Sequence, residues 1–226
     1  MTFHVAEEWL RTYPGAVVGF MQMENVTNPP DHPALSEQVR QVEAALRSQW
    51  QGATRADLAQ LPEFEAYRSF YRRFDKTYHV QMQVESVVLK GKPLRSNGSL
   101  VLAMFAAELQ NRLLTAGHDL SRLSGPVTVG VAKGGERYVG LGGRNLALQP
   151  GDMFMQDQEG IISSVLYGPD DRTQITPATR QAAFCVYAPA GIGSEAVERH
   201  LADIAANVRL VAPEATVIRR VVFRAE

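Results

Sequence analysis

The run from Ser99 to about Leu114 limits the possible folds of this chain more than any other segment. A polar stretch at 96–99 opens the run, and its apolar side chains cover most of the circumference of a helix rather than one stripe. These side chains are Leu100, Val101, Met104, Phe105, Ala107 and Leu109. A helix that is apolar nearly all round must be covered on several sides. We therefore expect a buried central helix here.

Three other segments have helical period. Apolar residues recur every three or four positions from Leu35 to Trp50, from Phe64 to Phe74 and from Val197 to Val208. A proline at 33 suits the start of the first, which we expect from about 33 to 50. The second is rich in aromatic residues, and its other faces carry arginines. The pattern predicts three amphipathic helices in addition to the central one.

Short β-rich runs separated by glycine-containing turns fill residues 125–165, which predicts an antiparallel meander. The runs are 127–131, 137–141, 145–148, 153–156 and 161–165. Further strand-like runs lie at 16–23, 182–188 and 216–223. Helices dominate the first half and strands the middle, which favours an α+β fold over a parallel βαβ arrangement. We predict one domain over residues 1–226, with antiparallel strands around the central helix.

The composition excludes several classes of protein. The 226 residues are 45% hydrophobic and 21% charged, which excludes disordered, collagen-like and coiled-coil chains. The formal net charge of -1 gives no global attraction to polyanions, so any contact with nucleic acid would need a local basic face.

Sequence features also bear on the compartment. One cysteine cannot form an internal disulfide, which excludes a disulfide-dense secreted module. Glu7 and Glu8 stand where a signal peptide would carry positive charge, and no run approaches 18 apolar residues. The expectation is a cytoplasmic protein without a membrane partner, whose oligomeric state the sequence leaves open.

Familiar cofactor motifs are missing from the sequence. The five histidines show no metal-binding spacing, and the run Gly140–Gly143 lacks the GK[ST] ending of a phosphate loop, so we interpret it as a turn. Cys185 lies in an apolar run, where a thiol is more often a small inert hydrophobe than a nucleophile. We expect neither a metal nor a cofactor.

A few polar residues allow both a structural and a functional interpretation. Asn97 either caps the central helix or forms a polar pocket floor with the helix N-terminus. His118 and Asp119 form either a helix-ending turn or part of a cleft, and Glu85 is either exposed or an inward carboxylate that needs a partner.

Three arginines, Arg68, Arg72 and Arg73, are the candidate basic face. They form either a solvated helix face or, with Tyr67 and Tyr71 beside them, a surface that meets phosphates and stacks bases.

The order and spacing of several motifs resemble a known family. The chain is similar over roughly residues 10–220 to the B3/B4 domain of the phenylalanyl-tRNA synthetase β subunit, in its free-standing form. The motifs are Tyr67-Arg68 with Tyr71-Arg72, Val84-Glu85, Leu89-Lys90-Gly91-Lys92-Pro93-Leu94-Arg95-Ser96-Asn97, Gly117-His118-Asp119-Leu120-Ser121-Arg122-Leu123-Ser124-Gly125, Leu148-Gln149-Pro150-Gly151-Asp152, Asp157-Gln158-Glu159-Gly160 and 170–180.

In the synthetase this module is the editing domain, which binds the acceptor end of a mischarged tRNA and hydrolyses the tyrosyl ester without metal or cofactor. The resemblance implies a pocket between the helix that starts at Asn97, the turn at 117–119 and the segment 167–179. Asn97 and His118 would then be the catalytic candidates. Expected substrate-binding residues are Glu85, Asp119, Tyr167, Gly168 and Thr179, and the expected RNA-binding residues are Arg68, Arg72 and Arg73.

The chain departs from the synthetase pattern at two positions. Where the synthetase has the histidine of a His-x-Phe-Asp motif, this chain has Ala116 or Gly117 next to His118, and where it has a later glutamate, this chain has Cys185 or an apolar neighbour. Two hypotheses follow. The first is a binding module for an aminoacyl-tRNA end or an amino acid, and the alternative is a trans-editing hydrolase of mischarged aminoacyl-tRNA.

Overall fold

The computed structural model, which describes residues 1–226, is built on a four-stranded antiparallel sheet in the order β11-β2-β10-β3. Its strands are β2 (Val17–Glu24), β3 (Leu114–Asp119), β10 (Gln181–Ala188) and β11 (Thr216–Arg224). Strands β2 and β10 are central and buried on both faces, which explains why they are apolar without a period-two alternation. Strand β3 is an edge, and the candidate site lies beside it.

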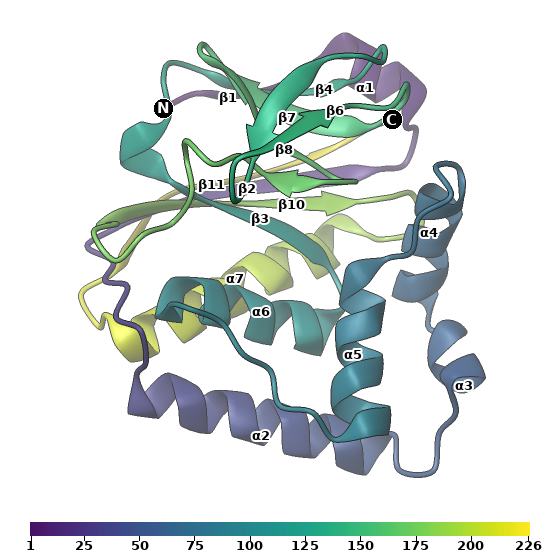
Figure 1. Ribbon diagram of the computed structural model, residues 1–226, viewed down its shortest axis with the longest axis vertical. Coiled ribbons are helices and arrows are strands. Elements are labelled where there is room, and N and C mark those ends of the chain that lie inside the picture. Colours follow the sequence, from purple (N-terminus) through teal and green to yellow (C-terminus); the bar gives the residue numbers. More distant parts are fainter.

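Helices cover one face of this sheet (Figure 1). They are α2 (Pro33–Gln49), α6 (Ser99–Asn111) and α7 (Ser194–Val211). Helix α7 packs closely on β2, because a Cβ at Gly19 would lie 2.5 Å from Val197 Cγ1. The Asn207 amide of α7 donates to Ala103 O of α6 at 3.1 Å. Helix α6 is thus enclosed by α2, α7 and the sheet, as its apolar circumference predicts.

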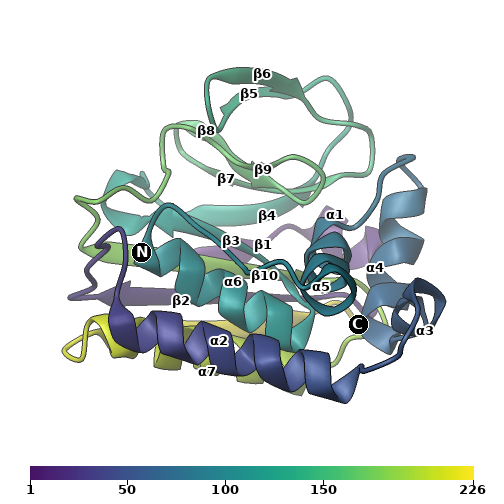
Figure 2. The same ribbon diagram turned by 60° about the horizontal axis from the view of Figure 1, so that its bottom comes forward.

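A second sheet, in the order β1-β4-β7-β8-β9, lies on the opposite face (Figures 1 and 2). Its strands are β1 (Phe3–Val5), β4 (Val127–Val131), β7 (Met153–Asp157), β8 (Gly160–Ser164) and β9 (Gly168–Pro169), and a separate hairpin joins β5 (Arg137–Gly140) to β6 (Arg144–Ala147). The Phe3 ring stacks on Phe20 of β2 at 4.4 Å between centroids. One apolar core therefore spans both sheets.

The remaining helices flank the sheets. They are α1 (Glu7–Thr12), α3 (Arg55–Ala59), α4 (Pro62–Arg72), α5 (His79–Lys90) and a 3-10 turn, η1 (Leu120–Arg122). Tyrosines fasten α4 to both sheets. The Tyr67 hydroxyl donates to Tyr187 O at 2.6 Å and accepts from Leu114 N at 2.8 Å, and Tyr71 donates to Val165 O at 2.8 Å. These buried bonds fix the α4 end of the candidate site.

The structure confirms the α+β fold and most of the expected elements, and it corrects three expectations. The meander expected over 125–165 is wrong, because β4 pairs with β7 and the β5–β6 hairpin forms a separate sheet. Helix α6 ends at Asn111, because Arg112 adopts the left-handed conformation with φ 62° and Leu114 already belongs to β3. The helix-ending turn expected at His118 is wrong, since that residue lies inside β3. The turn at 140–143 is confirmed, and Gly142 and Gly143 adopt φ of 74° and 76°, which suits a tight hairpin.

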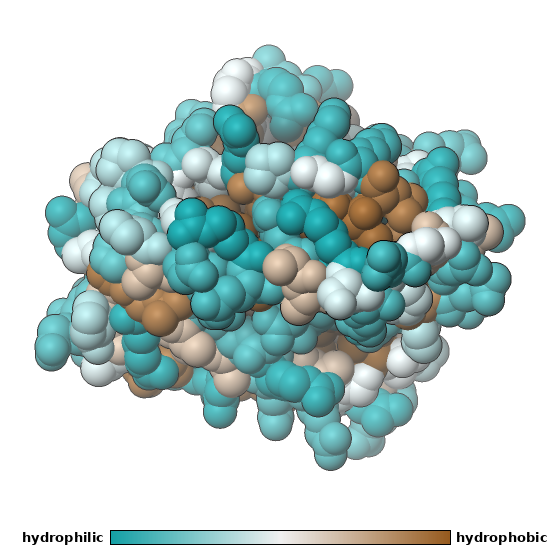
Figure 3. All heavy atoms as spheres, turned by 90° about the horizontal axis from the view of Figure 1, so that it is seen from below, coloured by the Kyte–Doolittle hydropathy of each residue, from teal (hydrophilic) through white to brown (hydrophobic).

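None of the helices combines the length and the apolar character needed to cross a bilayer. The helical side in Figure 3 is mostly hydrophilic, with separate apolar patches between polar side chains. Apolar patches of this kind are ordinary on a folded protein.

Candidate functional site

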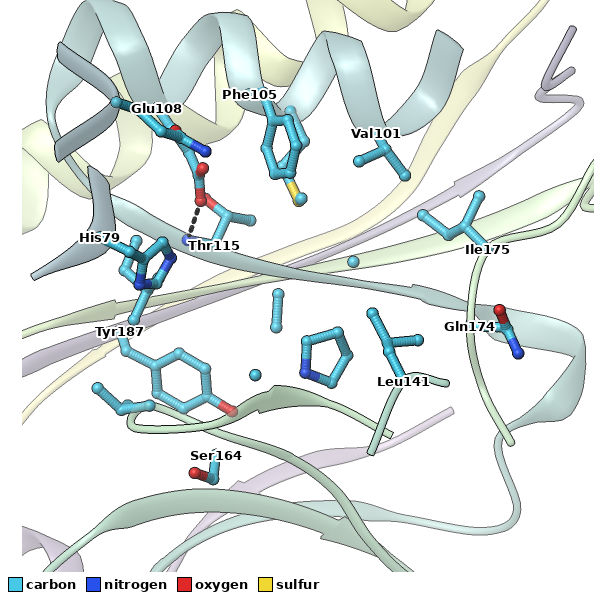
Figure 4. Close-up of a pocket in the computed structure, with 18 residues that line it drawn as sticks. His79, Val101, Phe105, Glu108, Thr115, Leu141, Ser164, Gln174, Ile175 and Tyr187 are labelled. Atoms are coloured by element: carbon cyan, nitrogen blue, oxygen red, sulfur yellow. Dashed lines mark hydrogen bonds between the residues drawn. The ribbon is translucent and has the colours of Figure 1, made fainter. Parts of the chain in front are cut away.

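A cavity of about 260 Å³ lies between α6, the edge strand β3 and the β8–β9 segment (Figure 4). Its apolar walls include Val101, Met104, Phe105, Leu114, Val165 and Ile175. Val101, Phe105 and Glu108 point into it from one face of α6, because positions i, i+4 and i+7 align on a helix. The cavity therefore runs along α6, with a carboxyl group towards the C-terminal end of the helix.

Glu108 is the most unusual residue of the cavity wall. Its side chain is fully buried, and its Oε1 accepts a hydrogen bond from Thr115 N at 2.7 Å. Its Oε2 is also buried and has no partner. Loss of solvation raises the pKa of this carboxyl to about 8, so it is mostly protonated at neutral pH. The cavity thus contains a neutral acid with an unused hydrogen-bonding oxygen.

A second polar group of the cavity is also unsatisfied. Gln83, on α5, lines the cavity, and its Oε1 is buried without a partner. The other buried polar groups are occupied, since Tyr187 shares a hydrogen bond with Ser163 at 2.7 Å and Ser164 donates to Asp152 at 2.6 Å. Buried polar atoms without partners are rare in native proteins, so this pair indicates where a ligand would bond.

A polar hollow of about 410 Å³ adjoins the cavity at the start of α6. Val101, Phe105 and Ile175 belong to the walls of both. The hollow is otherwise lined mainly by polar or backbone groups, which are Asn28, Arg95, Ser96, Asn97 and Gly98. Cavity and hollow together form one cleft with an apolar part and a polar part, which we call the α6 cleft.

Asn97 lies in the polar hollow, but it does not cap α6. The N-cap position is Gly98, and no side chain of that residue can cap. Instead Asn28 Oδ1 accepts from Leu100 N at 2.9 Å, and a Cβ at Gly98 would lie 2.7 Å from that oxygen. The cap interpretation of Asn97 is therefore wrong, and its exposed side chain is left free in the hollow.

His118 does not line the cavity or the hollow, and its ring is fully buried. The ring Nδ1 lies 2.7 Å from Thr173 Oγ1. Because the Thr173 hydroxyl donates to Asp170, its oxygen accepts from His118 Nδ1–H. Burial lowers the pKa of His118 to about 3, so the ring is neutral. The structure does not bring His118 together with Asn97.

Asp119 and Thr179 form a buried link beneath the cleft. The Thr179 hydroxyl donates to Asp119 Oδ2 at 2.7 Å and accepts from Thr176 N at 2.9 Å. Asp119 Oδ1 also accepts from the backbone and side chain of Ser121. This link fastens the loop that carries Ile175 to β3, so these two residues position the cavity wall without lining it.

The other expected substrate-binding residues lie in different places. Gly168 lines the cavity. Tyr167 does not, and its hydroxyl accepts from Gln149 at 3.0 Å. Glu85 is buried away from the cavity and accepts from Arg55 at 3.0 Å and from Gln81 at 2.9 Å. Of the two interpretations of Glu85, the inward carboxylate with a partner is the one observed.

The three candidate arginines are divided between two places. Arg68 and Arg72 line a basic hollow beside α3, whereas Arg73 lies over the rings of Tyr13, Phe70 and Phe74 at 5.3–5.8 Å. The suggested base-stacking role of Tyr67 and Tyr71 is wrong, because both rings are at most 2% exposed.

The remaining candidates for chemistry are buried or dispersed. No three His, Cys, Asp or Glu side chains come close enough together to hold a metal ion. Cys185 is fully buried in β10, and burial raises the pKa of its thiol. This environment is that of an inert thiol.

Sequence reasoning missed Glu108 and Gln83. A signal for Glu108 was present, because it is the one acidic residue inside an otherwise apolar helix that was expected to be buried. Gln83 had no such signal, since the helix that carries it, α5, was not recognised.

Comparisons with known proteins relate part of this chain to one domain family. Residues 109–208 match the family model of the B3/4 domain. No curated protein matches the chain. Among solved structures it is similar to an N-terminal fragment of the phenylalanyl-tRNA synthetase beta-subunit from Pyrococcus horikoshii.

That similarity has a TM-score of 0.50 at 11% sequence identity and covers 96% of this chain. The chain spans about half the length of that fragment, since the match covers 50% of it. At this level of identity the likeness concerns the fold alone. Residues 109–208 thus match the B3/4 domain, and the chain shares its fold with a phenylalanyl-tRNA synthetase beta-subunit fragment.

Proposed function

We propose that this protein binds the aminoacylated acceptor end of a tRNA, or the amino acid alone, in the α6 cleft. The observation that carries the proposal is an apolar cavity with two unpartnered polar atoms, joined through three shared wall residues to a polar hollow. The fold shared with a phenylalanyl-tRNA synthetase beta-subunit fragment supports a tRNA-related role.

The cavity suits an amino-acid side chain of medium size. Its volume of about 260 Å³ lies just below the range usual for drug-sized ligands. Along α6, Val101 and Glu108 are separated by roughly 10 Å at a rise of 1.5 Å per residue. A side chain that enters from the Val101 end therefore meets apolar walls first and the Glu108 carboxyl last.

The polar hollow suits the other end of such a ligand. The Asn97 amide makes no hydrogen bond within the protein, and Arg95 supplies a positive charge next to it. An ester carbonyl, a carboxylate or the terminal ribose would find donors here. We assign the amino-acid side chain to the cavity and the ester or carboxylate end to the hollow.

Filling the cleft should abolish ligand binding. Val101→Phe adds bulk where cavity and hollow meet, whereas Leu102→Phe, the matched control, alters a half-buried neighbour that lines neither. Ligand at 100 times its Kd stabilises a protein by about 2.7 kcal/mol, which is a rise in melting temperature of about 5–10 °C at this size. We expect that rise for the wild type and Leu102→Phe, and none for Val101→Phe.

The measurement is thermal unfolding in the presence of free amino acids and of a panel of charged tRNAs. If no amino acid and no aminoacyl-tRNA stabilises the wild type, the proposed function is wrong. If Val101→Phe responds like the wild type, binding occurs outside the α6 cleft.

Hydrolysis of the ester is the alternative function, and the free Asn97 amide beside the start of α6 favours it. Such an amide can donate to the oxyanion of a tetrahedral intermediate. If the protein is a hydrolase, Asn97→Ala should lower kcat by roughly 10²–10³. Because Asn97 is exposed and is not the cap, we expect its replacement to change the free energy of unfolding by less than about 0.5 kcal/mol.

This prediction is checked by the release of free amino acid from mischarged tRNA, with unfolding measured on the same samples. A wild type that releases none from any charged tRNA is a binding module. An Asn97→Ala variant that hydrolyses at the wild-type rate would exclude the amide from the reaction.

A further inference from the structure

The basic hollow between α3 and α4 is separate from the α6 cleft and has a volume of about 550 Å³. Nine residues line it, of which four are cations and none is acidic. The cations are Arg55 from α3, Arg68 and Arg72 from α4, and Lys76 from the connection between α4 and α5. Such a concentration of one charge is notable in a chain whose net charge is -1.

Only one of the four cations is paired with an acidic side chain. Arg55 is paired with Glu85 at 3.0 Å, and Lys76 Nζ lies 4.7 Å from the centre of the Tyr167 ring. Arg68 and Arg72 make neither an ion pair nor a side-chain hydrogen bond to any residue of the chain. They lie one turn apart on the same face of α4, about 6 Å between Cβ atoms, so the two guanidinium groups repel each other.

The other polar groups of this hollow are mostly donors. Thr77 contributes an exposed hydroxyl, and the Gln81 amide is directed to Glu85. The Tyr78 side chain is buried, and its hydroxyl donates to Arg112 O. The hollow thus offers guanidinium and hydroxyl donors, and no acidic residue lines it, which is the chemistry that binds phosphate.

The basic hollow lies next to the α6 cleft along the chain. Thr77 and Tyr78 line the hollow, and the next residue, His79, lines the cavity. On the other side, Lys76 reaches over Tyr167, which precedes the cavity residue Gly168. A strand whose end occupies the cleft can therefore reach the hollow within a few nucleotides.

We propose that the basic hollow binds consecutive phosphates of an RNA strand, with Arg68 and Arg72 as the principal contacts. This inference rests on the proposed function, because it takes the RNA to be the one whose aminoacylated end enters the α6 cleft. RNA fits better than a small anion, since two unneutralised guanidinium groups one helical turn apart match a polymer that repeats its charge at regular intervals.

The test is the binding of end-labelled deacylated tRNA, measured by fluorescence anisotropy at several salt concentrations. Arg68→Gln/Arg72→Gln should weaken binding about tenfold at 0.1 M salt. It should also reduce the slope of log K against log salt by about 1.4–1.8, since each phosphate contact contributes roughly 0.7–0.9. The matched control is Arg73→Gln/Arg220→Gln, which removes the same charge from outside the hollow.

The outcomes separate the possibilities. Wild-type affinity in Arg68→Gln/Arg72→Gln, or an equal loss in the control pair, would overturn the assignment. Inorganic phosphate that binds the wild type when tRNA does not would identify a small anion as the occupant and overturn the RNA assignment. If tRNA binds through the hollow while no aminoacyl ligand stabilises the protein, the phosphate site stands and the proposed function fails.

Discussion

Glu108→Gln is expected to make the protein more stable than the wild type at pH 8.5. Burial raises the pKa of Glu108 to about 8, against an ordinary value of 4.5. Between pH 4.5 and pH 8 the folded state therefore holds a proton that the unfolded state has lost. The free energy of unfolding falls as the pH rises through this range. The difference between the two pKa values corresponds to a loss of stability of roughly 5 kcal/mol at most, at 1.36 kcal/mol per pKa unit. Glutamine keeps the acceptor for Thr115 N and cannot ionise.

The measurement is denaturant unfolding of both proteins from pH 4.5 to 9. We expect the stability advantage of Glu108→Gln to grow by about 1.4 kcal/mol per pH unit from pH 4.5 to about 8 and to level off above that. Asp152, whose pKa burial raises to about 7, gives both proteins a slope of the same sign, so only their difference reports on Glu108. A constant difference between the two proteins across the range would contradict this account.

His200→Gln is expected to have the opposite dependence on pH. Asn111 Nδ2 donates to His200 Nδ1, so the other ring nitrogen carries the proton and donates to Thr115 Oγ1 at 2.7 Å. Burial lowers the pKa of His200 to about 3, whereas the unfolded histidine titrates near 6.5. The unfolded state then binds more protons below pH 6.5, and the wild type loses stability as pH falls to about 3.

The expected loss from this one ring approaches 5 kcal/mol, which is comparable to the whole stability of many domains. Glutamine can keep the bond to Thr115 without taking up a proton. We expect the variant to be less stable than the wild type at pH 7, because a fully buried ring is lost. Its deficit should shrink by about 1.4 kcal/mol for each unit below pH 6.5. A deficit that is the same at pH 7 and pH 4.5 would show that His200 is not neutral in the folded state.

Periodicity predicted most of the fold because the core elements have one-sided or all-round apolar patterns. Helix α2 and strand β10 were found within one or two residues, since each contacts the core with a regular set of side chains. Helix α5 was not recognised, because only the short apolar stretch from Val84 to Leu89 stood out, which is too short to tell a helix from a strand. The predicted C-terminal end of α6 was too late in the sequence, because Leu113 and Leu114 continue its apolar pattern into β3.

The candidate site was less predictable, because burial and long-range partners decide which polar residues are free. The sequence allowed Asn97 either to cap α6 or to line a pocket, and the cap comes instead from Asn28, about 70 residues earlier in the chain. His118 directly follows the cavity residue Gly117, yet its ring is bonded to Thr173 and does not line the cleft. Arg73 follows Arg72 in the sequence, but it lies over aromatic rings outside the basic hollow that Arg72 lines. Adjacency in the sequence therefore did not predict which side chains lie together in the site.

The two sides of the cavity come from different parts of the sequence, and only one of them lies in the segment that matches the domain model. Strand β3, Val165, Gly168 and Ile175 lie within residues 109–208, the part that matches the domain family. The side chains with unused polar atoms, Glu108 and Gln83, lie before it. Substitutions at these two positions therefore alter the unpartnered polar groups of the cavity and leave the matched segment intact. The polar groups of this cavity wall can thus vary independently of the segment that carries the match.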